Sequence, residues 1–104
     1  MPDASDVLRL ICKVYHSISP YTKLVPTTYI ARELGIERKE AQKLVKELKE
    51  RGLVYSGCES CYDELSEKYY IVRGFTLTKQ GKETEISKEE YEKEEKIRKE
   101  IYGF

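Results

Sequence analysis

The cysteine and histidine residues of this sequence have the side chains that a zinc ion requires. Cys58 and Cys61 form a Cys-x-x-Cys pair, and the third cysteine, Cys12, lies four positions before the single histidine, His16. Cys12 and His16 would share one face of a helix, so the four side chains have the number and type for a Cys₃His site. A single Cys-x-x-Cys pair is weakly specific, however, and buried cysteines commonly pack as small hydrophobic residues. We therefore expect no bound metal or cofactor, and keep a zinc site and a redox-active pair as alternatives.

Other motifs for catalysis are absent from the sequence. His16 has no serine or cysteine nucleophile as its partner in a known motif, and no glycine-rich phosphate-binding loop occurs. The 19 acidic residues have the character of solubilising surface charge. We therefore expect that the protein is not an enzyme.

Positive and negative charges balance in number but are segregated along the chain. The 104 residues include 19 Lys and Arg against 19 Asp and Glu, and hydrophobic residues make up 39%. This composition suits one densely charged domain with one core, spanning residues 1–104. Residues 20–51 contain eight positive and five negative side chains, whereas residues 83–104 contain five positive and eight negative. The positive excess therefore coincides with a segment that we predict to be helical.

The spacing of apolar residues predicts three helices in the first half of the chain. Residues 5–18 repeat apolar side chains at steps of three and four, and Ser19-Pro20 should end this helix. Residues 27–34 form a short second helix, and residues 37–51 form a third with one apolar stripe. The residues expected to cap or end these helices are Ser5 or Asp6, Thr27, Gly35 and Gly52.

The pattern changes from helix to strand in the second half of the chain. Residues 53–55 and 69–73 are predicted to pair as an antiparallel hairpin, with Gly74 as a bulge or bend. The polar segment between them, residues 56–68, is expected to be a long loop. An acidic loop is repelled by phosphates, so it is a poor surface for DNA. The charged residues of this loop are Glu59, Asp63, Glu64, Glu67 and Lys68.

A further helix is predicted at the C-terminus. Ser87 and Glu90 have the spacing of a capping box, and the helix should run over about residues 87–102. Its apolar side chains form a thin stripe, which is the candidate surface for a homodimer. The alternative is that this helix packs on the predicted helix at residues 5–18. The residues of the stripe are Tyr91, Ile97, Ile101, Tyr102 and Phe104.

Three segments resemble the winged helix-turn-helix family of DNA-binding proteins. Residues 30–36 (IARELGI) are similar to the IA-x-x-LGI turn of that family, and residues 51–54 (RGLV) to its entry into the first wing strand. Residues 77–82 (LTKQGK) are similar to the segment that leaves the wing. The resemblance implies an α+β, mostly α, winged-helix fold with a three-helix core over about residues 5–84. It also implies a two- or three-stranded antiparallel wing, with the C-terminal helix as an addition.

The resemblance further implies sequence-specific binding of double-stranded DNA in transcriptional regulation, with the third helix in the major groove. Because successive helical residues are rotated by about 100°, Glu40 and Glu47 fall on one flank, apart from the positive side chains, whereas Glu50 shares the face of the lysines. We expect base contacts near the start of this helix and phosphate contacts near its end. The second helix and the wing would add contacts. The candidate DNA-binding residues are Thr27, Thr28, Arg38, Lys39, Gln42, Lys43, Lys46, Lys49 and Arg73.

Two other functions are compatible with the same fold. A protein-interaction module would bind its partner through the acidic loop and the C-terminal helix, because winged-helix folds also serve protein contacts. A zinc- or redox-responsive regulator would use Cys58 and Cys61. The acidic loop favours the first of these alternatives, and the paired cysteines favour the second.

The sequence also bears on location. The N-terminus has no basic stretch followed by an apolar run, as a signal peptide would have. No apolar segment approaches the roughly 20 residues that span a bilayer. We therefore expect a cytoplasmic protein that does not contact membranes.

Overall fold

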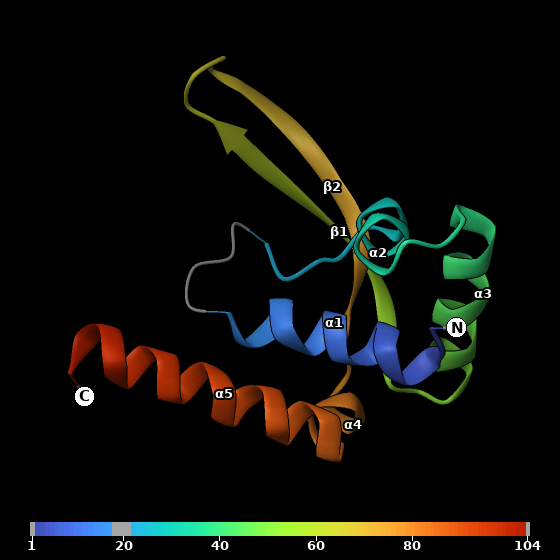
Figure 1. Cartoon of the computed structure of the whole chain (residues 1–104). Coiled ribbons are helices and arrows are strands. Elements are labelled where there is room, and N and C mark those ends of the chain that lie inside the picture. Colours follow the sequence, from blue (N-terminus) through green and yellow to red (C-terminus); the bar gives the residue numbers. More distant parts are fainter. Residues whose placement is uncertain (1, 18–21, 104) are drawn as a thin grey trace.

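The computed structural model describes residues 2–17 and 22–103. Three helices are followed by a two-stranded antiparallel hairpin and a C-terminal helix that packs on the first (Figure 1). The predicted α+β, mostly helical fold class is therefore confirmed. Among the described residues, no helix has the length and apolar character needed to cross a membrane. The elements are α1 (Ala4–His16), α2 (Thr27–Leu34), α3 (Arg38–Glu50), β1 (Val54–Asp63), β2 (Lys68–Leu77), α4 (Lys79–Lys82) and α5 (Glu85–Tyr102).

The second helix has the predicted bounds, but the first two helices are capped by other residues than predicted. Asp3 caps α1, not Ser5 or Asp6: Asp3 Oδ1 accepts a hydrogen bond from the Asp6 backbone N–H at 3.2 Å, and Asp6 Oδ2 accepts one from the Asp3 N–H at 2.9 Å. Pro26 precedes α2, so Thr27 is its first helical residue and does not cap it. Apolar spacing places a helix to within one turn, whereas backbone geometry selects the capping residue.

Glycine ends α2 as predicted. Gly35 has a φ of +65°, the left-handed conformation that glycine adopts at low cost. The following Ile36 N–H donates to the Ala31 carbonyl at 3.0 Å, which closes the turn into α3. Helix α1 ends at His16, with Ser17 as its C-cap, so the predicted extent to residue 18 was too long. Ile18, Ser19 and Pro20 lie outside the described residues.

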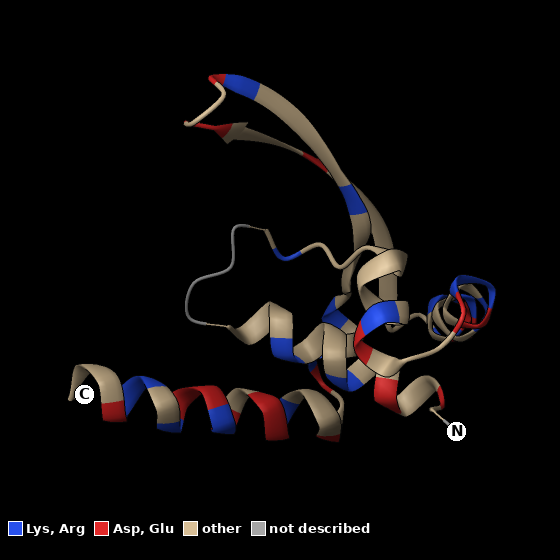
Figure 2. Ribbon diagram, turned by 45° about the horizontal axis from the view of Figure 1, so that its top comes forward, with Lys and Arg blue, Asp and Glu red and all other residues tan. Residues whose placement is uncertain are grey.

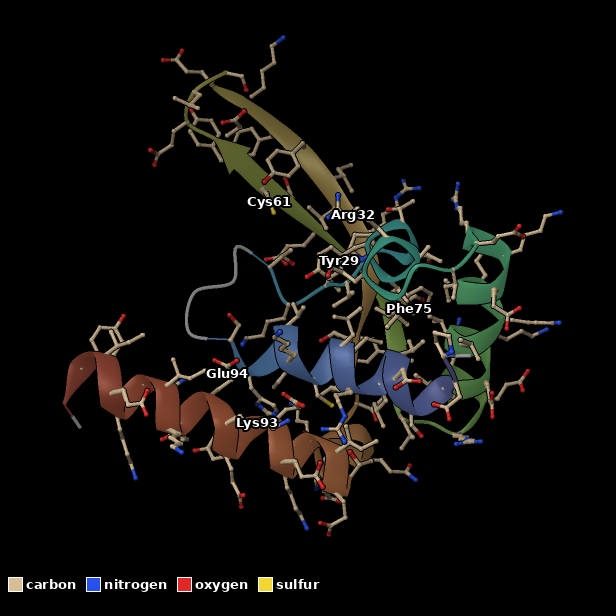
Figure 3. All side chains as sticks on the ribbon, in the orientation of Figure 1. Tyr29, Arg32, Cys61, Phe75, Lys93 and Glu94 are labelled. Carbon is tan, nitrogen blue, oxygen red and sulfur yellow. The ribbon has the colours of Figure 1, made fainter. Side chains whose placement is uncertain are left out.

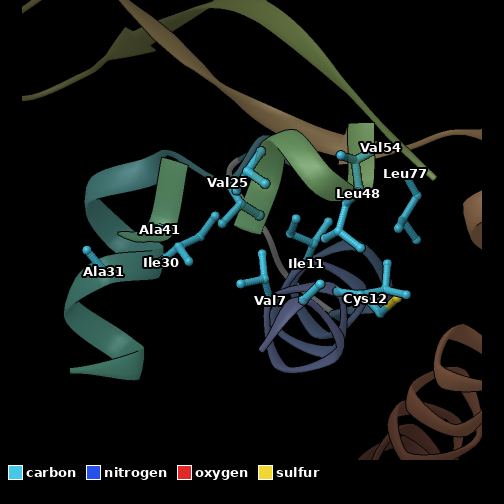
Figure 4. Packing of buried hydrophobic residues seen from close by; sticks show 13 residues of the cluster. Val7, Ile11, Cys12, Val25, Ile30, Ala31, Ala41, Leu48, Val54 and Leu77 are labelled. Carbon is cyan, nitrogen blue, oxygen red and sulfur yellow. The ribbon is translucent and has the colours of Figure 1, made fainter. Parts of the chain in front are cut away.

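The core lies between α1, α2, α3 and the base of the hairpin (Figure 4). Ile11 of α1, Ile30 of α2 and Leu48 of α3 are completely or almost completely buried. Each such side chain contributes about 1.5–3 kcal/mol of hydrophobic stabilisation. The predicted stripe of α3 is confirmed, because Ala41, Val45 and Leu48 are buried and Leu44 is half-buried. The inward face of α3 is thereby fixed, and so is its solvent face.

The hairpin is much longer than predicted. The register runs without a break from Val54 opposite Leu77 to Asp63 opposite Lys68, so only residues 64–67 turn between the strands. The expectation of two short strands and a long loop over residues 56–68 was therefore wrong. These residues lack the apolar alternation of a half-buried strand because most of them are exposed on both faces. Main-chain pairing, which apolar spacing does not report, keeps them extended.

A one-residue bridge attaches the hairpin to the helical body. The Val25 N–H donates to the Phe75 carbonyl at 2.8 Å, and the Phe75 N–H donates to the Val25 carbonyl at 3.0 Å. The sheet is thus two strands plus this single bridge. Gly74 pairs with Gly57 in continuous register, so of the two predicted alternatives, a bulge or a bend, the bulge was wrong. Gly74 instead permits close approach, because a Cβ there would lie 2.6 Å from the Val25 backbone carbon.

Helix α5 begins earlier than predicted. Thr84 caps it by accepting a hydrogen bond from the Ser87 N–H at 3.2 Å, so the expected capping box at Ser87 and Glu90 was wrong. Ser87 and Glu90 are buried instead, against α1. Arg9 of α1 donates to Glu90 at 2.9 Å and to Glu89 at 3.0 Å. The first half of α5 therefore packs on α1, and its second half extends past the end of α1 (Figure 1).

Substitution of the hairpin glycines tests the anchoring of the wing. Gly74→Ala should lower the free energy of unfolding by about 1–3 kcal/mol, because its Cβ meets backbone that cannot yield. Gly57→Ala is the matched control in the paired position. Its Cβ meets the flexible end of Leu24 at 2.7 Å, so it should cost less than about 1 kcal/mol. Urea denaturation measures both values, and equal losses would contradict this account of the bridge.

Candidate nucleic-acid interface

The solvent face of α3 is basic. Arg38 and Lys39 in its first turn and Lys46 near its end are exposed, as predicted from the apolar stripe. Two of the three carboxylates of α3 are turned aside: Glu40 and Glu47 are half-buried, and Glu47 accepts a hydrogen bond from Arg51. The third, Glu50, is exposed in the last turn. Figure 2 shows that α3 lies at the side of the molecule remote from α5. The positive face of α3 is therefore well separated from the most acidic helix.

A hollow of about 600 Å³ lies where α2, α3 and the hairpin meet. Thr27 and Thr28 line it from the start of α2, Arg38 from the start of α3, and Arg73 from β2. The N-terminal end of a helix carries partial positive charge, so the two guanidinium groups and the start of α2 favour an anion together. The structure thus brings four predicted residues together from three elements.

A second hollow, of about 480 Å³, adjoins the first. Gln42, Lys46 and Lys49 line it from α3, together with one carboxylate, Glu50. Thr27 and Phe75 line both hollows, so the two form one surface, which we call the basic surface. Seven of the nine candidate residues lie on it. Lys39 and Lys43 are exposed on α3 but line neither hollow.

Sequence reasoning missed the apolar residue that joins the two hollows. Phe75 lies at the base of the hairpin between α2 and α3 (Figure 3). The sequence pattern predicts a strand that ends at residue 73, which leaves Phe75 outside the sheet. Its pairing with Ser56 places it on the same face as Arg73 and Cys58. A longer strand would have identified this face from alternation alone.

The four side chains considered for zinc do not converge. Cys58 and Cys61 lie on β1, not in a loop, and a separation of three residues puts them on opposite faces of a strand, about 10 Å apart. That distance exceeds the Cα separation of a disulfide, which is below about 7 Å. Cys12 is buried in the core, and the described residues contain no group of three or more His, Cys, Asp or Glu side chains that could hold a metal ion.

Cys12 and His16 instead form a polar cluster with Ser87 between α1 and α5. His16 Nε2 lies 2.9 Å from Ser87 Oγ, and the His16 ring packs edge-on against Tyr91 at 5.5 Å. Burial raises the pKa of the Cys12 thiol to about 11. Burial also lowers the pKa of His16, and the nearby Lys23 adds to this effect. Ser87 is only 1% exposed, so the cluster joins the two helices.

Compared with known protein families, with curated proteins and with solved structures, the chain shows no match. The order of its elements, three helices followed by an antiparallel hairpin and a C-terminal helix, is compatible with winged-helix topology. Any functional assignment therefore depends on the surfaces of this chain.

The lowered pKa of His16 predicts that acid weakens the α1–α5 contact. Because the folded-state pKa lies below the unfolded value of 6.5, protonation favours the unfolded chain. The stabilisation is complete above the unfolded pKa and is lost as the pH falls through the folded one. His16→Gln keeps a partner for Ser87 but does not titrate. The melting temperature of the native protein should therefore fall more steeply than that of the variant between about pH 7.5 and 5.5. Parallel profiles would contradict the assignment.

Proposed function

We propose that this protein is a winged-helix regulator that binds double-stranded DNA sequence-specifically, with α3 in the major groove. The observation that carries the proposal is the basic surface, which joins the start of α2, one flank of α3 and β2. An ordinary solvated helix face would not combine with residues of two other elements around shared hollows. The half-buried positions of Glu40 and Glu47 support the proposal, because exposed carboxylates would repel phosphates. Glu50 is exposed at the end of α3, where Lys46 and Lys49 outnumber it.

The residues of the basic surface have different roles in this proposal. Arg38 and Gln42 reach base edges, where arginine pairs bidentately with guanine and glutamine with adenine. Lys46 and Lys49 contact phosphates farther along the groove. Thr27, Thr28 and Arg73 fix the position of the duplex on the body. Lys39 and Lys43, which line neither hollow, face the opposite wall of the groove.

We also propose a homodimer through the second half of α5. Ile97 and Ile101 are exposed there, one helical turn apart. Two copies would then read the two halves of a pseudo-palindromic site. Tyr102 adjoins these residues, and Phe104 lies outside the described residues.

Sedimentation of an α5 variant tests the dimer. Ile97→Ser with Ile101→Ser should convert a dimer to a monomer, because the change removes apolar area from the proposed interface. Leu65→Ser is the control, since it removes an exposed apolar side chain from the hairpin turn. A native protein that sediments as a monomer at high concentration would refute the dimer and leave DNA binding by one copy intact.

Titration of duplex DNA tests the main proposal. Selection from random duplexes would first supply a bound sequence, and fluorescence anisotropy would then give affinities. Arg38→Ala with Arg73→Ala should cost about 1–3 kcal/mol per arginine and flatten the salt dependence. Lys96→Ala with Lys99→Ala, which removes two exposed charges from α5, is the matched control and should change affinity little. The proposal fails if the native protein binds no duplex at low salt, or if both pairs lower affinity equally.

A further inference from the structure

The outer half of the hairpin carries large apolar side chains that are exposed. Tyr62 is 50% exposed, Tyr69 75% and Ile71 62%, while Leu65 in the turn is 98% exposed. Tyr62 pairs with Tyr69 across the strands, and Ile71 pairs with Ser60, so the three share one face. The Tyr62 and Tyr69 rings contact each other with centroids 5.0 Å apart. We call these four residues the hairpin patch.

Packing within the chain does not account for the hairpin patch. None of its residues belongs to the core or to the half-buried shell around it. The hairpin leaves the helical body on the side away from α5, and its outer half projects beyond the helices (Figures 1 and 3). A stable hairpin does not require four large apolar side chains in solvent. Contiguous exposed apolar groups with a polar rim mark interaction surfaces in soluble proteins.

The rim of the patch is acidic. Asp63 holds the turn, because its Oδ1 accepts a hydrogen bond from the Leu65 N–H at 3.1 Å and its Oδ2 accepts one from the Ser66 hydroxyl at 2.9 Å. Leu65 is thereby presented between Glu64 and Glu67. The only positive side chain in residues 59–68 is Lys68. Three carboxylates repel a phosphate backbone, so this surface cannot simply extend the basic surface.

The acidic rim also disfavours a second copy of the chain. Two patches placed face to face would bring like charges together. A patch placed on the basic face of α3 in another copy would make a head-to-tail contact, which forms open chains instead of a closed dimer. A different protein with positive charge would be attracted by the acidic rim, and its binding would not lead to open chains.

We propose that the hairpin patch binds a segment of another protein in which Lys or Arg side chains alternate with apolar ones. The apolar side chains pack on Tyr62, Tyr69 and Ile71. The cations meet Asp63, Glu64 and Glu67, and they also favour the faces of the tyrosine rings. This surface goes beyond the proposed function, since it is opposite in charge to the basic surface. It lies farther out on the same face of the hairpin, and Ile71 at its inner edge is two residues from Arg73. DNA would be bound at the base of the hairpin and the protein partner toward its turn.

The probe for this proposal is a synthetic peptide of repeated Arg-Leu-Lys-Tyr, added to isotope-labelled full-length protein and followed by NMR. Amide signals of the hairpin patch and the turn should shift, while those of α3 and α5 should not. Glu64→Lys with Glu67→Lys should weaken binding at least about tenfold and create affinity for the matching Glu-Leu-Glu-Tyr peptide. Glu92→Lys with Glu100→Lys, the same charge change at exposed positions of α5, is the control and should leave binding unchanged.

An apolar variant separates docking from simple charge attraction. Tyr69→Ser with Leu65→Ser changes no charge, yet should also weaken peptide binding at least about tenfold. The proposal is overturned if no hairpin signal shifts, if α5 signals shift instead, or if this variant binds as well as the native protein. Shifts of the patch with protein concentration alone would assign it to a second copy, and shifts with duplex DNA would assign it to nucleic acid. Either result would also overturn the proposal.

The two proposals fail separately in these experiments. Both patch variants should keep the native affinity for duplex DNA, because they leave the basic surface intact. Loss of peptide binding with DNA binding retained is therefore the expected pattern. If the native protein binds the peptide at the patch but no duplex, the proposed function fails and the patch stands.

Discussion

The contact between Val25 and the base of the hairpin fixes the position of the hairpin relative to α2 and α3. Two backbone hydrogen bonds join Val25 to Phe75, and the absence of a side chain at Gly74 lets the backbones meet. Thr27 follows Val25 by two residues, so this contact also sets where α2 begins relative to the wing. Phe75 and Thr27 line both hollows of the basic surface. If the hairpin shifted, Arg73 would move away from Arg38, and the two hollows would no longer form one basic surface.

Charge segregation explains how a chain with no net charge can offer a positive surface. Carboxylates concentrate on α5 and at the turn of the hairpin, whereas α3 presents lysine and arginine to solvent (Figure 2). Within α5, Glu90 is neutralised by Arg9 and Lys93, so the acidic helix can pack on α1. The hairpin is basic at its base and acidic at its turn, which suits two different partners at its two ends.

Much of the helical half of the molecule could be predicted because its apolar residues face a core. The buried stripe of α3 and the left-handed Gly35 follow directly from spacing and residue type. The hairpin could not be predicted in length, since Ser56, Glu59 and Ser60 remain exposed and show no alternation. The capping residues were also missed, because Ser87 has the chemistry of a cap but lies inside an interface. The spacing of apolar residues predicts which side chains are buried. It does not predict strand length, which depends on backbone pairing, or the capping residues, which depend on helix packing.

The candidate site was partly predictable, because the spacing of apolar residues predicts the buried face of α3. Exposed side chains on one flank of α3 follow from its buried stripe, whereas their meeting with Thr27 and Arg73 depends on the tertiary contact at Val25. NMR mapping of a selected duplex onto the protein tests that meeting most directly. The account predicts that signals of Thr27, Arg38, Gln42 and Arg73 shift together, while α5 is unaffected. Shifts centred on α5 or on the hairpin turn, or no enrichment of any duplex, would contradict it.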